Sequence, residues 1–239
     1  MTPADWCRLI VGLGLVFGLF QWTGSALGSD RGQAGILIAA IVVVATLAVD
    51  VLLLGESPHR AARQVGLAFP ARRGIIAALT AGVLLLFVIP AYAVVAGVQF
   101  AMYRDWWRLT PGLFAQAGVA EETLFRGYLF RHVREGRSFR EAVWIAAGPF
   151  VLAHLLLFAT LPWPVALASV ALAAVLSFPL ARLFELGGNT FWAPALVHTV
   201  IQGAVKLAIP VETDSPFPIV WIAASAVIPF VVFLNPRSA

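Results

Sequence analysis

The chain has 239 residues, of which 61% are hydrophobic and only 12% are charged, and its mean hydropathy is +0.90. A soluble domain carries about twice that charged fraction, so the composition excludes an ordinary soluble protein and indicates an integral membrane protein. The net charge of +4 comes almost entirely from arginines in short segments between apolar runs, which argues against nucleic-acid binding. The single cysteine, Cys7, excludes an intrachain disulfide.

Eight apolar segments are each long enough to cross a bilayer, because a membrane helix needs about 20 mostly apolar residues. The fifth and sixth segments are joined by a very tight turn, and the longest polar connection, residues 55–74, has room for a short surface helix. We therefore predict an all-α polytopic protein with about eight transmembrane helices, forming one domain over residues 1–239. The segments are residues 9–28, 33–54, 75–99, 112–133, 141–159, 162–183, 190–209 and 217–235.

The basic residues are distributed unevenly over the two sides of the membrane. Eight spans place both termini on one side, and that side receives eleven basic residues against four on the other. The positive-inside rule then places both termini in the cytoplasm, and we expect the protein in the inner (cytoplasmic) membrane of a bacterium. The eleven are Arg8, Arg60, Arg63, Arg72, Arg73, Arg131, Arg134, Arg137, Arg140, Arg182 and Arg237, and the four are Arg31, Arg104, Arg108 and Lys206.

The fourth segment contains three charged residues, in the run "GVAEETLFRGYLF" at residues 118–130. Glu122 and Arg126 are four residues apart, with the acid first, which is the favourable order for an ion pair on one helix face. Glu121 lies about 100° around the helix from Glu122, so it cannot share Arg126 equally. We predict a structural Glu122–Arg126 ion pair beside a Glu121 that points into a polar intramembrane cavity. The alternative is one buried packing network of all three side chains.

Two histidines lie in the middle of other segments, His154 in "GPFVLAHLLLF" and His198 in "FWAPALVHTVIQ". Gln202 follows His198 by one helical turn and shares its face. A carboxylate that activates water, assisted by imidazoles, is suited to general-base hydrolysis. A catalytic zinc site with Glu121, His154 and His198 as ligands and an open water position uses the same side chains. The residue types alone do not separate these two hypotheses.

The remaining polar residues and motifs narrow the possible functions. We interpret Asp50 as an interfacial or hydrogen-bonded residue, and His59 and His132 as solvated residues of arginine-rich loops. The sequence has no H-E-x-x-H, G-x-S-x-G or P-loop motif, which argues against zincins, serine hydrolases and nucleotide-driven proteins. A transporter would also bury ionisable residues, but it predicts internal repeats with interrupted helices, and the sequence shows none.

Three motifs together resemble one family. "AEETLFRGYLF" resembles the E-E-x-x-x-R signature of the CAAX protease and bacteriocin-processing (CPBP) family of intramembrane proteases, which includes the type II CAAX prenyl endopeptidases. "FVLAH", residues 150–154, fits its F-x-x-x-H motif, and "GNTFWAPALVHTVIQ" resembles its last motif. The resemblance covers roughly residues 66–205. Gln202 stands where the family usually has asparagine, which shifts the amide by about 1 Å, enough to affect a reaction rate.

The resemblance implies an intramembrane endopeptidase that cuts a peptide or protein substrate near a membrane-embedded or lipidated segment. It implies that Glu121 activates water with help from His154, while His198 and Gln202 polarise the scissile carbonyl and hold the oxyanion. Glu122 and Arg126 would keep the site in shape. We expect no cofactor, with zinc on Glu121, His154 and His198 as the alternative, and the oligomeric state stays open. The competing hypothesis is a non-catalytic membrane scaffold or bacteriocin-immunity protein that keeps the same fold.

Overall fold

A computed structural model describes residues 2–27, 31–212 and 215–234. Arg237 and the end of the eighth predicted segment lie outside these residues. The described chain is mostly helical, which confirms the all-α prediction. Its helices are α1 (Pro3–Ala26), α2 (Arg31–Leu52), α3 (Pro58–Gln64), α4 (Arg72–Ala96), α5 (Trp106–Leu113), η1 (Phe114–Ala120), η2 (Thr123–Phe130), α6 (Arg131–Arg134), α7 (Phe139–His154), η3 (Leu155–Ala159), α8 (Trp163–Leu186), α9 (Trp192–Leu207), α10 (Phe217–Val227) and η4 (Ile228–Leu234).

Each predicted apolar segment is largely helical, but the number of membrane spans is confirmed only in part. The predicted spans 112–133 and 190–209 are not among the helices that meet the requirement for length and hydropathy, and α9, the helix of the second span, has only 16 residues. The count of eight therefore stays a prediction. Within the described residues, six helices are long and apolar enough to cross a membrane, namely Pro3–Ala26, Ala34–Leu52, Arg72–Ala96, Phe139–Ala159, Trp163–Leu186 and Phe217–Leu234.

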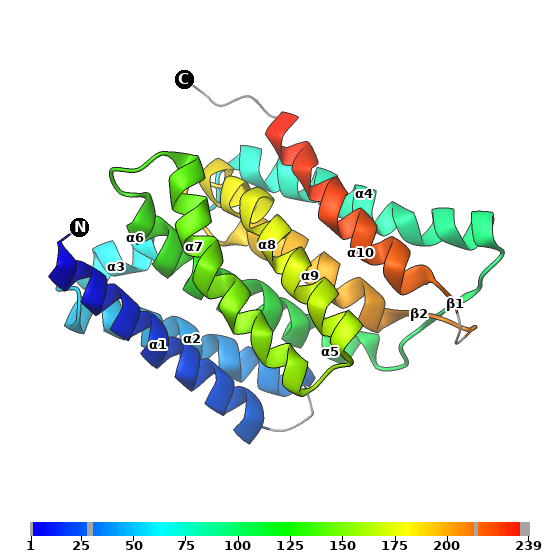
Figure 1. Cartoon of the computed structure of the whole chain (residues 1–239), viewed down its shortest axis with the longest axis horizontal. Helices are drawn as coiled ribbons and strands as arrows, with labels where there is room; N and C mark the ends of the chain where they lie inside the picture. Colours follow the sequence, from blue (N-terminus) through cyan, green and yellow to red (C-terminus); the bar gives the residue numbers. More distant parts are fainter. Residues whose placement is uncertain (1, 28–30, 213–214, 235–239) are drawn as a thin grey trace.

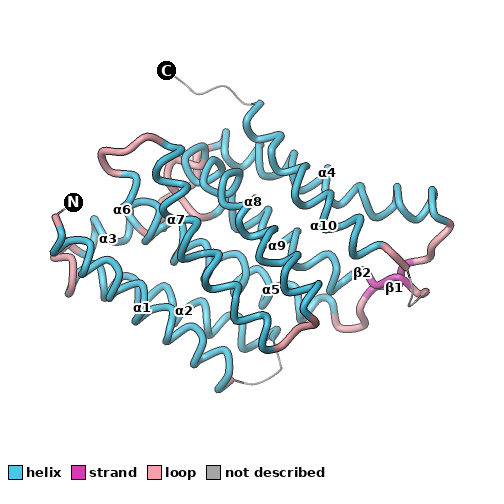
Figure 2. The backbone as a smooth tube through the Cα atoms, viewed as in Figure 1, coloured by secondary structure: helices cyan, strands magenta, loops and turns pink. Residues whose placement is uncertain are grey.

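Two connections between the helices are as predicted from the sequence, whereas a pair of short strands is not predicted. The surface helix expected in residues 55–74 is α3, and the tight turn lies between η3 and α8. The sequence does not predict strand β1 (Phe100–Met102), which pairs antiparallel with β2 (Ala208–Pro210). The strand pair joins the end of α9, which carries His198 and Gln202, to the chain before α5. The helical run that begins with α5 continues to Glu121 (Figure 2).

The helix ends gather at two ends of the bundle (Figure 1). We call the end with the start of α1, α3 and α6 the basic end, and the end with β1 and β2 the far end. At the basic end, Arg134 Nε lies 2.8 Å from Glu185 Oε1, and Trp192 Nε1 donates to the carbonyl of Ala68 over 3.0 Å. These contacts bring α6, α8, α9 and the chain after α3 to one place.

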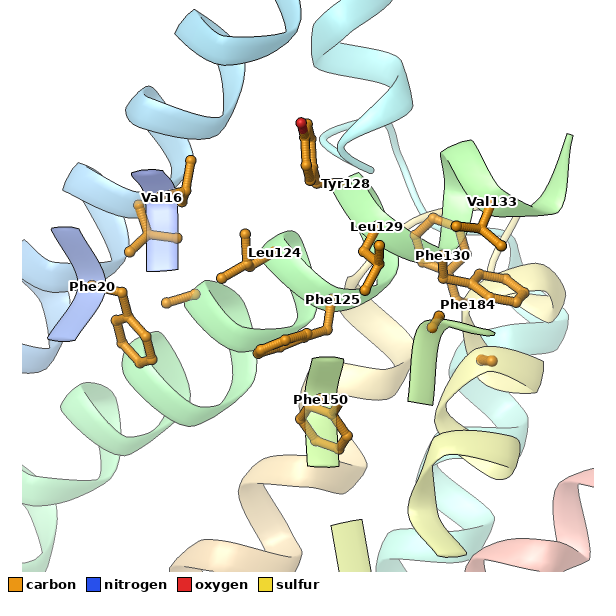
Figure 3. Close-up of a cluster of buried hydrophobic side chains, with 14 of the residues drawn as sticks. Val16, Phe20, Leu124, Phe125, Tyr128, Leu129, Phe130, Val133, Phe150 and Phe184 are labelled. Atoms are coloured by element: carbon orange, nitrogen blue, oxygen red, sulfur yellow. The ribbon is translucent and has the colours of Figure 1, made fainter. Parts of the chain in front are cut away.

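The motif helix is the unbroken run of residues 106–134, formed by α5, η1, η2 and α6. Its second half is surrounded by apolar side chains, and every residue from Thr123 to Phe130 is buried. Gly127 lies so close to Val65 that an added Cβ would collide with the Val65 carbonyl, so only glycine permits this approach. Figure 3 shows the apolar cluster, which includes Val16, Phe20, Leu124, Phe125, Tyr128, Leu129, Phe130, Val133, Phe150 and Phe184.

Candidate active site

The motif helix is wound as a π-helix on both sides of the two glutamates. The N–H of Glu121 reaches back to the carbonyl of Gln116, and the N–H of Arg131 reaches back to that of Arg126, each five residues earlier. A π-helix closes such i→i+5 bonds, is rare, and occurs often at functional sites. The sequence predicts regular α-helical spacing here, so this local winding is a correction. The pairing that the sequence predicts is nevertheless present.

Glu122 is the centre of a buried polar network. Its Oε1 atom lies 3.2 Å from Arg126 Nη1, which confirms the predicted ion pair. The same atom lies 2.6 Å from His198 Nδ1, a contact that the sequence does not suggest. Glu122 is fully buried and Arg126 nearly so, while the guanidinium carbon of Arg126 lies 4.2 Å from the centre of the Phe150 ring. The two charges are thus enclosed by one another, an imidazole and an aromatic face.

The hydrogen bonds of His198 determine its tautomer. Nδ1 donates to the Glu122 carboxylate, so this nitrogen carries the hydrogen. Nε2 lies 3.0 Å from Gln202 Nε2, and the amide nitrogen can only donate, so the imidazole nitrogen accepts. The amide orientation is supported by Lys206, whose Nζ lies 3.4 Å from Gln202 Oε1. A neutral His198 therefore links the buried carboxylate to Gln202.

Glu121 is placed differently from its neighbour. Its side chain is 15% exposed, whereas that of Glu122 is fully buried, and its Oε2 lies 3.8 Å from His198 Nε2. Glu121 lines a cavity of about 670 Å³ between the motif helix, α7, α8 and α9. The prediction that the two glutamates point in different directions is therefore confirmed. Glu121 still approaches the buried network through His198, so a purely structural role for all three charged residues stays the alternative.

His154 lines the same cavity at the end of α7. Its Nδ1 lies 2.8 Å from the carbonyl oxygen of Phe150, which can only accept, so Nδ1 carries the hydrogen. In that tautomer, Nε2 keeps a lone pair that can accept a hydrogen from water. Phe150, which begins the F-x-x-x-H motif, thus orients His154 through its backbone and covers Arg126 with its ring.

The structure brings the four predicted catalytic residues to one cavity and leaves the ion pair behind its wall. Glu122 and Arg126 do not line this cavity, in agreement with a supporting position. Several polar residues on the wall are not among the sequence predictions, including Gln21, Gln116 and Lys206. The sequence does hold a signal for Lys206, since it follows Gln202 by four residues on the same helix face. The cavity residues that carry the predicted chemistry are Glu121, His154, His198 and Gln202.

Zinc on Glu121, His154 and His198 stays the alternative to a metal-free site, and all three side chains line the same cavity. Among the described residues, no group of three or more histidine, cysteine, aspartate or glutamate side chains is placed to hold a metal ion. In the tautomer described above, His198 Nδ1 donates to Glu122 and Nε2 accepts from Gln202. A metal at His198 would have to take the place of Gln202, whereas Nε2 of His154 keeps a free lone pair.

The interpretation of His132 as a solvated loop residue is wrong. His132 lies in α6, its side chain is 12% exposed, and its Nε2 lies 3.8 Å from Asp50 Oδ1. Nδ1 of His132 lies 2.7 Å from the carbonyl of Tyr128. Asp50 is fully buried, and neither of its carboxylate oxygens has a hydrogen-bond partner among the described residues. The hydrogen-bonded half of its interpretation is therefore wrong, while an interfacial position stays a prediction. His59, by contrast, is exposed on α3 as predicted.

Comparison with protein families agrees with this geometry. Residues 103–204 match the family model described as type II CAAX prenyl endopeptidase Rce1-like. The match covers less than half of the chain, and it shows that this segment is similar to the Rce1-like family. The family prediction made from the three motifs is confirmed, and the match includes Glu121, Glu122, Arg126, His154, His198 and Gln202.

The six apolar helices and the match together indicate an integral membrane protein with a segment that is similar to a peptidase family. The matched segment lies inside the predicted family core of residues 66–205 and covers the motif helix, α7, α8 and most of α9. Comparison with curated proteins found no relative that matches the chain. The roles of the individual site residues therefore rest on the geometry described above and stay predictions.

Proposed function

We propose that this protein is an intramembrane endopeptidase that hydrolyses a peptide bond near a membrane-embedded or lipidated segment, with a glutamate as general base and without a metal. The observation that supports it is the cavity on which Glu121, His154, His198 and Gln202 meet, built by an Rce1-like segment. A further support is the unequal burial of the two glutamates, which leaves only Glu121 within reach of a water molecule in the cavity.

In the proposed reaction, a water molecule lies between the carboxylate of Glu121 and the free Nε2 of His154. Glu121 takes a proton from this water as the oxygen attacks the carbonyl carbon of the scissile bond. Gln202 donates one amide hydrogen to His198, which leaves its second amide hydrogen for the developing oxyanion. The protonated Glu121 then returns the proton to the leaving amine. The products are one new carboxylate and one new amine.

This mechanism changes one role that the family resemblance implies. The resemblance has His198 polarise the scissile carbonyl directly. In the tautomer inferred from its two hydrogen bonds, Nε2 accepts a hydrogen bond and cannot donate one to an oxyanion. We therefore assign the donor role to Gln202, and to His198 the role of holding Gln202 in place against the Glu122–Arg126 pair.

The proposed function predicts that a strain without the active enzyme carries peptide termini that differ from those of the wild-type strain. We would compare the termini of membrane and secreted peptides in a strain that carries the wild-type gene with those in a strain that carries Glu121→Gln. Uncut precursors should accumulate only in the Glu121→Gln strain. The comparison requires that the wild-type protein and the variant are present in the membrane in equal amounts. Identical sets of termini, together with a wild-type phenotype, would favour the non-catalytic scaffold.

Gln202→Leu should reduce cleavage by roughly 10²–10³-fold, because it removes the proposed oxyanion donor while keeping a side chain of similar size. The loss should be in kcat, since the donor acts mainly on the transition state. We would measure kcat and KM of the purified enzyme, with Gln202→Asn as the matched control. Asparagine should restore part of the activity, as it keeps the amide. Equal activity of Gln202→Leu and the wild type would remove Gln202 from the mechanism.

Metal chelators should leave cleavage unchanged. Both ring nitrogens of His198 are engaged within the protein, so the proposed reaction does not use a metal. We would incubate the detergent-purified enzyme with a strong chelator and dialyse it before measuring cleavage. Loss of activity that added zinc restores would show that His198 or Glu121 binds a metal in the active enzyme.

A further inference from the structure

The position of the cavity along the bundle carries information about its substrate. We propose that the cavity opens on the extracytoplasmic face of the membrane and takes peptide segments that are presented from that face. This inference rests on the proposed function for its chemistry, while its topology is tested independently of cleavage. It narrows the substrate class to segments that have already been translocated or inserted.

The cavity extends to the far end of the bundle. Its wall includes Thr160 and Leu161, both exposed, in the turn between η3 and α8. It also includes Lys206, in the last turn of α9, next to the paired strands. From His198 to Leu207, α9 rises about 14 Å at roughly 1.5 Å per residue. The site is therefore deep in the bundle, and its opening lies at the end marked by β1 and β2 in Figure 1.

The path from the site to the basic end is closed. Between Glu122 and the basic end, the motif helix is buried at every position from Thr123 to Phe130. Figure 3 shows the side chains of Tyr128, Leu129 and Phe130 within the packed apolar cluster. The gap beside Arg126 on this side has a volume of only about 10 Å³, which is about the room of one water molecule. Among the described residues, the motif helix therefore leaves no room for a peptide on this side of Glu121, whereas the cavity extends to the far end.

The charges assign the two ends to the two faces of the membrane. The far end holds Arg104, Arg108 and Lys206 among the described side chains. Cytoplasmic segments carry an excess of arginine and lysine, so the basic end faces the cytoplasm and the cavity opens away from it. The basic end holds ten arginines of the described chain, namely Arg8, Arg60, Arg63, Arg72, Arg73, Arg131, Arg134, Arg137, Arg140 and Arg182.

The cavity wall suits an extended membrane-proximal peptide. Gln21, Gln116 and Ser169 offer polar groups from three different helices, and aromatic and aliphatic side chains such as Phe17 and Leu172 line the space between them. Apolar walls with a few placed polar groups are typical of sites that bind a ligand in a fixed orientation. The polar groups can bind the peptide backbone, and the apolar wall can receive the side chains of a segment that leaves the bilayer on the outer face.

Cysteine labelling tests the orientation directly. Cys7 is the only cysteine, so Cys7→Ser gives a background without thiols. Thr160→Cys then places one thiol at the cavity opening, and His59→Cys places one on α3 at the basic end, both at exposed positions. Each variant would be treated with a membrane-impermeant maleimide in bacterial spheroplasts, and again after solubilisation in detergent. Labelling in detergent measures the reactivity of each thiol in the folded protein and is the reference.

We expect Thr160→Cys to be fully labelled in intact spheroplasts. His59→Cys should remain unlabelled in intact spheroplasts and become labelled only after the membrane is solubilised. The reverse pattern would overturn the proposed orientation, as would labelling of both positions or of neither in intact spheroplasts. Labelling reports only the orientation of the protein in the membrane, whereas the Glu121→Gln comparison of peptide termini reports cleavage. The two proposals can therefore fail separately. A reversed orientation with precursor accumulation would leave the proposed function intact and show that the substrate comes from the cytoplasm.

Discussion

Glu121→Gln is expected to reduce cleavage by roughly 10²–10⁴-fold while leaving the folded protein almost as stable as the wild type. Glutamine keeps the shape of the side chain but cannot accept a proton from water. Glu121 is partly exposed to the cavity, and the ion pair of Arg126 is made with Glu122 instead. We would purify both proteins in detergent and measure peptide cleavage and thermal unfolding on the same preparations.

The matched comparison for this variant is Glu122→Gln, which makes the same chemical change one residue away. Its main effect should be on stability, because Glu122 is the buried partner of Arg126 and His198. If Glu121→Gln unfolds at the lower temperature of the two, or cleaves at a near wild-type rate, our assignment of general base and structural carboxylate is wrong. The pair of variants therefore separates a catalytic role from a structural one within a single helix turn.

Apolar segments in the sequence are sufficient to predict the helices. The hydrophobic runs are long and are bounded by proline, glycine and charged residues, so their limits agree closely with α2, α4 and α8, whereas α1 begins six residues before the predicted span. The short strands are not predictable in this way, because β2, residues 208–210, continues the apolar run of α9 without a break in composition. Only its pairing with residues 100–102, far earlier in the chain, makes it a strand.

The site is predictable wherever a short spacing determines a contact. Glu122 and Arg126 are four residues apart on one helix, and that spacing alone predicts the ion pair. The hydrogen bond from His198 to Glu122 joins residues 76 positions apart, so it depends on how α9 packs against the motif helix. The same limit applies to Asp50 and His132, which meet across α2 and α6.

The network around Glu122 also explains how one helix can hold two glutamates with different roles. Glu122 Oε1 accepts hydrogen bonds from Arg126 and His198, whereas its buried Oε2 has no hydrogen-bond partner among the described residues. Glu121 faces the cavity and the more distant His198 Nε2. Only Glu121 therefore presents its carboxylate to water in the cavity. Both carboxylates lie near His198, at 2.6 Å for Glu122 and 3.8 Å for Glu121, from adjacent positions between two π-helical segments.

Glu122→Gln is expected to lower the free energy of unfolding by roughly 3–5 kcal/mol, the usual cost of leaving a buried ion without its partner. Arg126→Met should cost less. A carboxylate left alone can take up a proton and become neutral, and Glu122 keeps its hydrogen bond to His198. An arginine cannot lose its charge in a protein, so Arg126 would remain a buried cation against the Phe150 ring. We would measure unfolding of both variants in the same detergent at one pH.

The double variant Glu122→Gln with Arg126→Met completes the test. Because it removes both charges, it should be more stable than Glu122→Gln alone, which is the result that identifies a stranded cation as the cause of instability. If the two single losses simply add in the double variant, the ion pair contributes no coupling and Glu122 acts only through His198. If Arg126→Met is the less stable single variant, the cation supports the fold through Phe150 rather than through Glu122, and the structural role belongs to the arginine itself.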